Sequence, residues 1–255
     1  MKLRSFLAVV GTCVCAATQA GEVTVAVAAN FTAPMQKIAK LFEQDTGHKA
    51  QLAFGATGKF YAQIKNGAPF AVLLAADDET PARLEKESLA VTGTRFTYAV
   101  GRLALWGKNP TLVDDKGEVL RSSNFDKLGI HKIALADPKL APYGAAALEV
   151  MTHLGVLPAI KSRLVQGESI GQTYQFVSTE NAQLGFVALS QISFEGRITQ
   201  GSAWVVPPSM HTPLKQDAVL LNVGKDNPAA LALLKYLQGD AAKGLIRSYG
   251  YALAN

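Results

Sequence analysis

Two short segments of the chain carry residue types that suit the binding of a small anion. Asn30 and Thr32 follow an apolar run that ends at Ala29, and Thr57 lies in the turn formed by residues 55–59. Each segment stands where a β-strand is expected to pass into a helix, so free backbone N–H groups meet short amide or hydroxyl side chains. Two such corners brought face to face would form a cage for an anion. Taken singly, they also fit a tight glycine turn and a capping asparagine.

The turn at residues 55–59 is not a nucleotide-binding P-loop. That motif needs a glycine at position 53 and a serine or threonine at position 60, where this chain has Ala53 and Phe60. Two further strand–helix corners are expected at residues 137–144, with Tyr143, and at residues 169–171. The alternative, purely structural interpretations are that Tyr143 only packs against its neighbours and that Ser169 is an ordinary N-cap.

No catalytic grouping emerges from the sequence, so we predict that the protein is not an enzyme. The four histidines are scattered, at positions 48, 131, 153 and 211, and no Gly-x-Ser-x-Gly motif occurs. The acidic run at residues 77–79 could bind a metal, but a solvated loop explains it better. A secreted α/β hydrolase stays open as an alternative, although it requires a nucleophile–base pair.

The first 20 residues have the pattern of a signal peptide. Lys2 and Arg4 precede an apolar core at residues 6–16, and residues 18–20 form a small-residue cleavage site. We therefore expect an exported, periplasmic protein. Both cysteines of the chain lie in this segment, which leaves none for disulfides or thiolate sites in the mature protein.

The charge of the chain argues against nucleic-acid binding. Removal of Lys2 and Arg4 lowers the formal net charge from +5 to +3, and no arginine-rich run or basic–aromatic pattern follows. A length of 255 residues suits one large or two medium domains.

Strand-like and helix-like segments alternate along the chain, which predicts an α/β fold with two lobes. Each lobe is expected to contain a mainly parallel sheet flanked by helices, with a ligand cleft between the lobes. The predicted division gives residues 1–20 to the signal peptide, 21–100 plus 205–255 to lobe I, and 101–204 to lobe II. Extended crossings are expected near residues 98–106 and 203–222.

Three stretches carry a resemblance to a known family: GATGKFYAQIKNGAPFAVLLAA at 55–76, ADPKLAPYG at 136–144, and QTYQFVSTENAQLGFVALSQ at 172–191. Together they resemble the periplasmic molybdate-binding proteins of ABC importers. The resemblance implies a two-lobed type II periplasmic binding protein without a cofactor. It further implies a monomer that captures molybdate or tungstate and delivers this small inorganic oxyanion to a membrane permease.

The family binds its oxyanion through hydroxyl groups and backbone amides, with no direct ligand to the metal atom. Matched motif by motif, the oxyanion-binding residues implied here are Ala29, Asn30, Thr57, Tyr143 and Ile170. Ile170 contributes its backbone N–H. Ala188 stands where many members have a tyrosine, so the resemblance implies that Tyr143 supplies the missing hydroxyl.

Another small anion is the nearest rival ligand. Sulfate and thiosulfate would use the same kind of cage, and only the size of the cavity would separate them from molybdate. A small carboxylate would favour an arginine at the site, and none of the four corners contains one.

Overall fold

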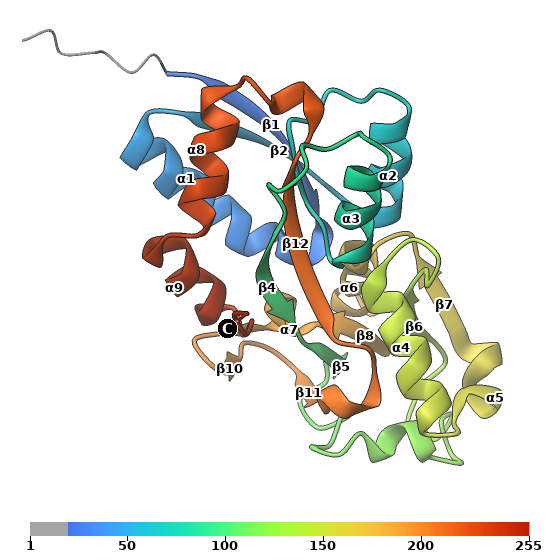
Figure 1. Ribbon diagram of the computed structural model, residues 1–255. Coiled ribbons are helices and arrows are strands. Elements are labelled where there is room, and N and C mark those ends of the chain that lie inside the picture. Colours follow the sequence, from blue (N-terminus) through green and yellow to red (C-terminus); the bar gives the residue numbers. More distant parts are fainter. Residues whose placement is uncertain (1–19, 255) are drawn as a thin grey trace, which may run out of the picture.

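The computed structural model describes residues 20–254 (Figure 1). The predicted signal peptide, apart from Ala20, lies outside the described residues. The chain folds into two five-stranded sheets, each flanked by helices. We call the sheet that contains β1 and its helices lobe I, and the sheet that contains β5 and its helices lobe II. This arrangement confirms the predicted α/β class with two lobes.

Lobe I is built on a sheet of order β2-β1-β3-β12-β4. Its strands are β1 (Glu22–Ala28), β2 (Lys49–Gly55), β3 (Val72–Leu74), β4 (Phe96–Gly101) and β12 (Leu214–Leu220). Its helices are the 3-10 helix η1 (Ala29–Phe31), α1 (Thr32–Thr46), α2 (Thr57–Lys65), α3 (Glu79–Lys86), η5 (Asn222–Gly224), α8 (Pro228–Leu237) and α9 (Asp240–Ser248).

Both faces of the lobe I sheet are covered by helices, which explains why β1 is apolar apart from the exposed Glu22 and the half-buried Thr24. The valines of β1 pack in one core with α1, α8 and α9. On the other face, Ala26 packs with Phe60 of α2 and Leu84 of α3. Alternate residues of a strand point to opposite faces, so a strand buried on both sides needs apolar residues at every position. Figure 1 shows α1 and α8 on one side of β1 and α2 and α3 on the other.

Lobe II repeats this plan with a sheet of order β11-β5-β8-β6-β7. Its strands are β5 (Leu103–Gly107), β6 (Ile133–Ala136), β7 (Leu164–Gly167), β8 (Leu184–Ala188) and β11 (Ser202–Val205). Its helices are η2 (Glu118–Arg121), α4 (Pro142–His153), α5 (Leu157–Ile160), η3 (Lys161–Arg163), α6 (Ile170–Ser178) and α7 (Leu189–Ile192). A small hairpin, β9 (Ser193–Phe194) and β10 (Arg197–Ile198), and η4 (Pro208–Met210) lie on the way back to lobe I.

No single helix within residues 20–254 is long and apolar enough to cross a membrane. The α4 helix and the segment 157–163 are together long and apolar enough for a membrane span, but their axes are bent by 116° relative to each other. Much of α4 is buried in the core of lobe II.

Each sheet contains one strand that runs against the others, and in both sheets it is the strand that arrives from the other lobe. β5 pairs antiparallel with β8 and β11, and β12 pairs antiparallel with β3 and β4. The remaining strands of each sheet share one direction, with their carboxyl ends toward the other lobe. A chain that leaves one lobe at that end must enter the next sheet there, and therefore runs the opposite way.

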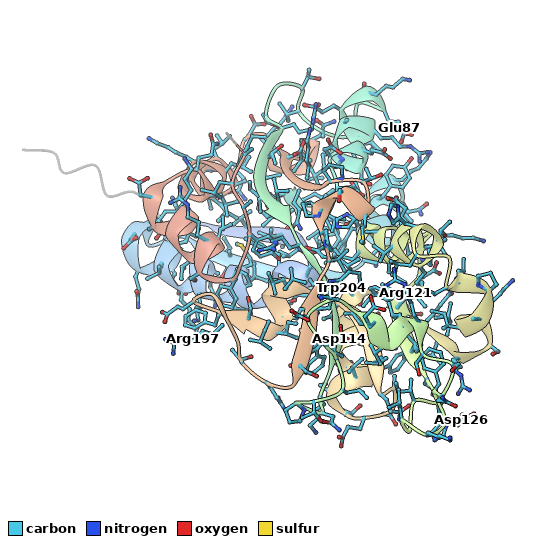
Figure 2. All side chains as sticks on the ribbon, turned by 90° about the horizontal axis from the view of Figure 1, so that it is seen from below. Glu87, Asp114, Arg121, Asp126, Arg197 and Trp204 are labelled. Carbon is cyan, nitrogen blue, oxygen red and sulfur yellow. The ribbon has the colours of Figure 1, made fainter. Side chains whose placement is uncertain are left out.

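Charged side chains lie mostly outside this framework. Asp126 and Arg197 are exposed at the edge of the molecule in Figure 2. The carboxylate of Asp217 is an exception, because it is 1% exposed. It accepts hydrogen bonds of 2.6 Å from Arg95 Nη1 and from Thr97 Oγ1.

The start of α3 depends on a half-buried carboxyl group. α3 begins at Glu79 after the N-cap position Asp78, and the side chain of Asp77 bonds Thr80 in its first turn. Asp77 Oδ1 accepts from Thr80 N at 2.8 Å, and Oδ2 accepts from Thr80 Oγ1 at 3.2 Å. Burial raises the pKa of Asp77 from 3.8 to about 6, against the opposing effect of these two bonds.

We expect Asp77→Asn to stabilise the protein at pH 7.5 but not at pH 4. A folded-state pKa above the unfolded one means that stability falls as pH rises from about 4 to 6, because the folded state resists losing the proton. A shift of about two pKa units corresponds to at most about 3 kcal/mol. Asparagine keeps an acceptor for Thr80 and does not ionise.

Urea unfolding at both pH values, followed by circular dichroism, measures the difference. Asp78→Asn, on the same turn, controls for the loss of one negative charge. A stability gain of Asp77→Asn that is the same at both pH values would contradict the role assigned to burial.

Candidate functional site

Four strand–helix corners meet where the two lobes face each other. The corners after β1 and β2 belong to lobe I, and those after β6 and β7 belong to lobe II. A small cavity lies between them, lined by Ala28, Ala29, Asn30, Gly55, Ala56, Thr57, Ala76, Ala141, Pro142, Tyr143 and Ile170. The structure thus brings together all five residues that the sequence places at the site, from both lobes. Ala188 is not among the lining residues.

The size and the lining of this cavity restrict what it can hold. The space open to the centre of a water-sized sphere is ≈ 10 Å³, close to the requirement of a single bound water. Pockets for organic ligands are typically about 300 Å³ or more. None of the eleven lining residues carries a formal charge. The cavity therefore suits one small group held by neutral polar atoms.

Three of the helices that open onto the cavity have no capping side chain. Ala28, Ala56 and Ala141 occupy the N-cap positions of η1, α2 and α4, and none of them makes a side-chain cap. Alanine is a poor N-cap, and the first amides of a helix have no acceptor within the helix. The first amides of η1 and α2 remain available to a ligand, as does the Tyr143 N–H, which follows Pro142, a residue without an N–H, in α4. The partial positive charge of the helix ends favours a negative ligand.

The fourth corner keeps an ordinary cap and still presents an amide. Ser169 caps α6, and its side chain accepts from Gln172 N at 3.3 Å. Ile170, the first residue of α6, precedes this bond and lines the cavity. Its N–H lies in the first helical turn, where no intrahelical acceptor exists.

The hydroxyl of Thr57 is fixed so that its proton remains to be donated. Thr57 is 1% exposed, and its Oγ1 accepts a hydrogen bond of 3.0 Å from Ala76 N. A hydroxyl has a single proton, and accepting a bond leaves that proton free. Thr57 therefore suits a ligand that accepts hydrogen bonds.

Asn30 does not cap a helix, contrary to one of the two interpretations of the sequence. Its side chain is buried, and Nδ2 donates to Gln216 Oε1 at 2.8 Å and to Tyr251 OH at 2.9 Å. Its backbone oxygen accepts from Ser190 Oγ and Tyr251 OH, each at 2.8 Å. Asn30 Oδ1 is buried without a partner among residues 20–254. Thr32 Oγ1 donates to Ala29 O at 2.9 Å.

Buried tyrosines surround Asn30, and each remains a neutral hydrogen-bonding group. Burial raises the pKa values of Tyr98, Tyr143 and Tyr251 above the usual range for a phenol. Tyr143 OH accepts from Gln216 Nε2 at 3.0 Å, and Tyr98 OH bonds Ala75 O at 2.9 Å. Sequence reasoning missed Gln216, Tyr98 and Tyr251, because no local motif marks them.

The two lobes contact each other directly beside the cavity. Gly58 N of lobe I donates to Leu140 O of lobe II at 2.9 Å. A side chain at position 58 would press on Leu140, since its Cβ would lie 3.1 Å from the Leu140 Cα. Lys59 pairs with Glu168 of lobe II, and the side chain of Lys59 is 42% exposed.

A second opening, of ≈ 430 Å³, lies on one side of these contacts and is acidic, with Asp77, Asp78, Glu79 and Glu149 among its lining residues. These carboxylates do not form a metal site. Within the described part of the chain, no group of three or more histidine, cysteine or acidic residues is placed to hold a metal ion.

Comparison with known proteins agrees with this geometry. Residues 23–252 match the family described as bacterial extracellular solute-binding protein. The chain is 58% identical over 243 residues to molybdate-binding protein ModA of Azotobacter vinelandii, and the matched region covers 95% of this chain and 94% of that protein. It is 51% identical over 233 residues to ModA of Rhodobacter capsulatus, with coverage of 91% and 88%.

A solved structure shows the same fold. The periplasmic molybdate-binding protein of Azotobacter vinelandii superposes with a TM-score of 0.87 at 36% identity, over 91% of this chain and 100% of that one. The predicted two-lobed binding-protein fold is thereby confirmed. From its sequence and its fold, this chain belongs to the bacterial extracellular solute-binding proteins and, within them, to the ModA family.

Proposed function

We propose that this protein captures molybdate, and tungstate as its close analogue, in the cavity between the lobes. The observation that carries the proposal is the convergence of uncapped helix N-termini on an uncharged cavity, where the hydroxyl proton of Thr57 is also unused. The relatives named molybdate-binding protein support the choice of anion.

Neutral donors are sufficient to hold such an ion. Burial of a dianion is costly unless each oxygen accepts hydrogen bonds. Hydrogen bonds to a charged group contribute about 1.5–3 kcal/mol each, and the aligned helix ends add partial charges without a formal cation. Asn30, Thr57, Tyr143 and Ile170, with Ala29, are the residues that we assign to this cage.

Two alternative functions, carboxylate binding and hydrolysis, need groups that the cavity lining does not supply. A carboxylate binder would favour an arginine, and a hydrolase would need a nucleophile beside a base; neither is among the eleven lining residues. Sulfate and thiosulfate remain the alternative ligands, because they differ from molybdate mainly in size.

We also propose the biological setting that the family suggests. The protein is exported to the periplasm through residues 1–20, acts there as a monomer without a cofactor, and delivers its oxyanion to the membrane permease of an ABC importer. Its role is binding and release, and no chemical step is assigned to it.

Isothermal titration of residues 21–255 with molybdate, tungstate, sulfate and phosphate tests the proposal. We expect tight binding of molybdate and tungstate, and binding of sulfate and phosphate that is weaker by orders of magnitude. Tight binding of sulfate alone would show that sulfate, and not molybdate, is the ligand. The absence of measurable binding of any of the four anions would refute oxyanion capture.

Loss of the Thr57 hydroxyl should weaken binding markedly. We expect Thr57→Ala to lower molybdate affinity by about 10- to 100-fold, the value of one hydrogen bond to a charged acceptor. Thr57→Ser keeps the hydroxyl and is the matched control, with affinity close to wild type. Calorimetry measures both, and equal affinities for the alanine and serine variants would remove Thr57 from the cage.

Lys59 should contribute little, because its partner Glu168 is exposed and no charge is needed at the cavity. An exposed ion pair is worth about 0.2–1 kcal/mol, so we expect Lys59→Ala to reduce molybdate affinity by no more than about fivefold. Glu168→Gln should have the same small effect, and the double variant should add nothing to it. A loss of more than about tenfold for Lys59→Ala alone would show that its charge acts on the ligand.

A further inference from the structure

Gln216 occupies a special position in the strand that enters lobe I from lobe II. It lies in β12, is fully buried, and marks a register shift between β12 and β4. Gln216 faces Ala99 and Asp217 faces Thr97, so Tyr98 is one extra residue in β4. Such a bulge redirects side chains locally, and here Tyr98 OH lies 3.0 Å from Gln216 Oε1.

The amide of Gln216 joins the two lobes at the back of the cavity. Its Oε1 accepts from Asn30 of lobe I at 2.8 Å, and its Nε2 donates to Tyr143 OH of lobe II at 3.0 Å. Gly101 makes room for this contact. A Cβ at position 101 would collide with both Tyr143 OH and Gln216 Nε2.

In this first arrangement, Asn30 presents an acceptor and Tyr143 presents a donor. Both protons of Asn30 Nδ2 are used on Gln216 and Tyr251, and Oδ1 has no partner among residues 20–254. Tyr143 OH accepts from Gln216, so its own proton is not used in that bond. One acceptor and one donor together match a protonated oxyanion, which has an O–H of its own.

A second arrangement follows when both side-chain amides turn by 180°, which exchanges oxygen and nitrogen and leaves the shape unchanged. Gln216 Nε2 then donates to Asn30 Oδ1, and Gln216 Oε1 accepts the proton of Tyr143. Tyr98 stays satisfied, because it still donates to Ala75 O. Tyr251 OH, which accepted from Asn30 Nδ2, turns its proton to Asn30 Oδ1, and Asn30 O keeps the bond from Ser190 Oγ. Asn30 Nδ2 now occupies the position that lacked a partner, and Asn30 becomes a donor.

The two amides must turn together. If only one turned, Asn30 Oδ1 and Gln216 Oε1, or their two NH₂ groups, would face each other across 2.8 Å. Two acceptors or two donors in contact inside the protein leave buried polar groups unsatisfied, which is costly. Asn30 and Tyr143 therefore alternate as side-chain donors and do not donate at the same time.

We propose that Gln216 is a positioning residue that couples Asn30 to Tyr143, so that a fully deprotonated oxyanion is bound in the second arrangement, by Asn30 Nδ2, while the Tyr143 hydroxyl turns to Gln216. The inference rests on the proposed oxyanion function and deepens it. It differs from the expectation that Tyr143 gives its hydroxyl proton to the ligand; Tyr143 contributes through the N-terminus of α4 instead. Gln216 thereby makes the cage select the protonation state of the anion.

The first experiment compares two hydroxyl removals by calorimetry with molybdate. We expect Tyr143→Phe to lose less than about threefold in affinity, because the removed proton served Gln216, while Thr57→Ala loses at least about tenfold. A loss for Tyr143→Phe as large as that for Thr57→Ala would overturn the inference. A wild-type protein that does not bind molybdate would instead refute the proposed function.

The second experiment uses sulfate and hydrogen phosphate at pH 8, two dianions of similar size that differ by one proton. An ionised Gln216→Glu side chain has only acceptors, so it holds Asn30 Nδ2 and leaves Asn30 Oδ1 toward the ligand. We expect Gln216→Glu to lose molybdate affinity by at least about 100-fold and to bind hydrogen phosphate more tightly than sulfate. The added charge acts on both dianions alike and cancels in their ratio.

Gln216→Met is the neutral control of nearly equal shape. It leaves the Asn30 amide free to turn, so the loss of molybdate affinity should stay well below that of Gln216→Glu. The ratio of its affinities for sulfate and hydrogen phosphate should lie near one. Thermal melting confirms that each variant is folded; a purely structural role would lower the melting temperature and leave the ratio at the wild-type value. Folded Gln216→Glu that prefers sulfate, or that binds no phosphate at millimolar concentration, would overturn the inference.

Discussion

The first amides of η1 and α2, and the Tyr143 amide that follows Pro142 in α4, have no side chain to cap them, because alanine precedes each of these helices. Uncapped amides at one helix would merely face water, but here several helix ends converge on one small cavity. Their partial positive charges add at that point, and a buried anion needs no formal cation beside it. Strand direction, lobe closure and the uncharged lining all follow from the need to aim these amides together.

The two strands that cross between the lobes, β5 and β12, allow the helix N-termini of both lobes to converge on the cavity. The carboxyl ends of the parallel strands must face the other lobe, so that the helices after them start at the seam. β5 and β12 enter from that seam and therefore run against their neighbours. Because β12 starts at this seam, its first residues lie directly behind the cavity. Gln216 can consequently contact both Asn30 and Tyr143, which belong to different lobes.

Electrostatics at this site works through dipoles and through the placement of single protons. Lys59 and Glu168 form a charged pair that joins the lobes near the cavity, and this pair is solvent-exposed and so contributes little. In the interior, whether a group donates or accepts matters more, because an unmatched buried group has no water to satisfy it. The Thr57 hydroxyl, which accepts from Ala76 N, keeps its proton for a group that can accept it.

The sequence by itself determined the strand–helix alternation and the position of the corners. Continuous apolar strands and the turn at Thr57 are local features, and burial on both faces leaves a local pattern. The motifs around Asn30, Tyr143 and Ile170 predicted residues that line one cavity in the structure. Only the tertiary structure decided the partners of these residues: Asn30 bonds Gln216 and Tyr251, which lie 186 and 221 positions away. Periodicity reports which residues are buried, whereas hydrogen bonds between distant side chains depend on how two sheets are brought together, and no local pattern encodes that.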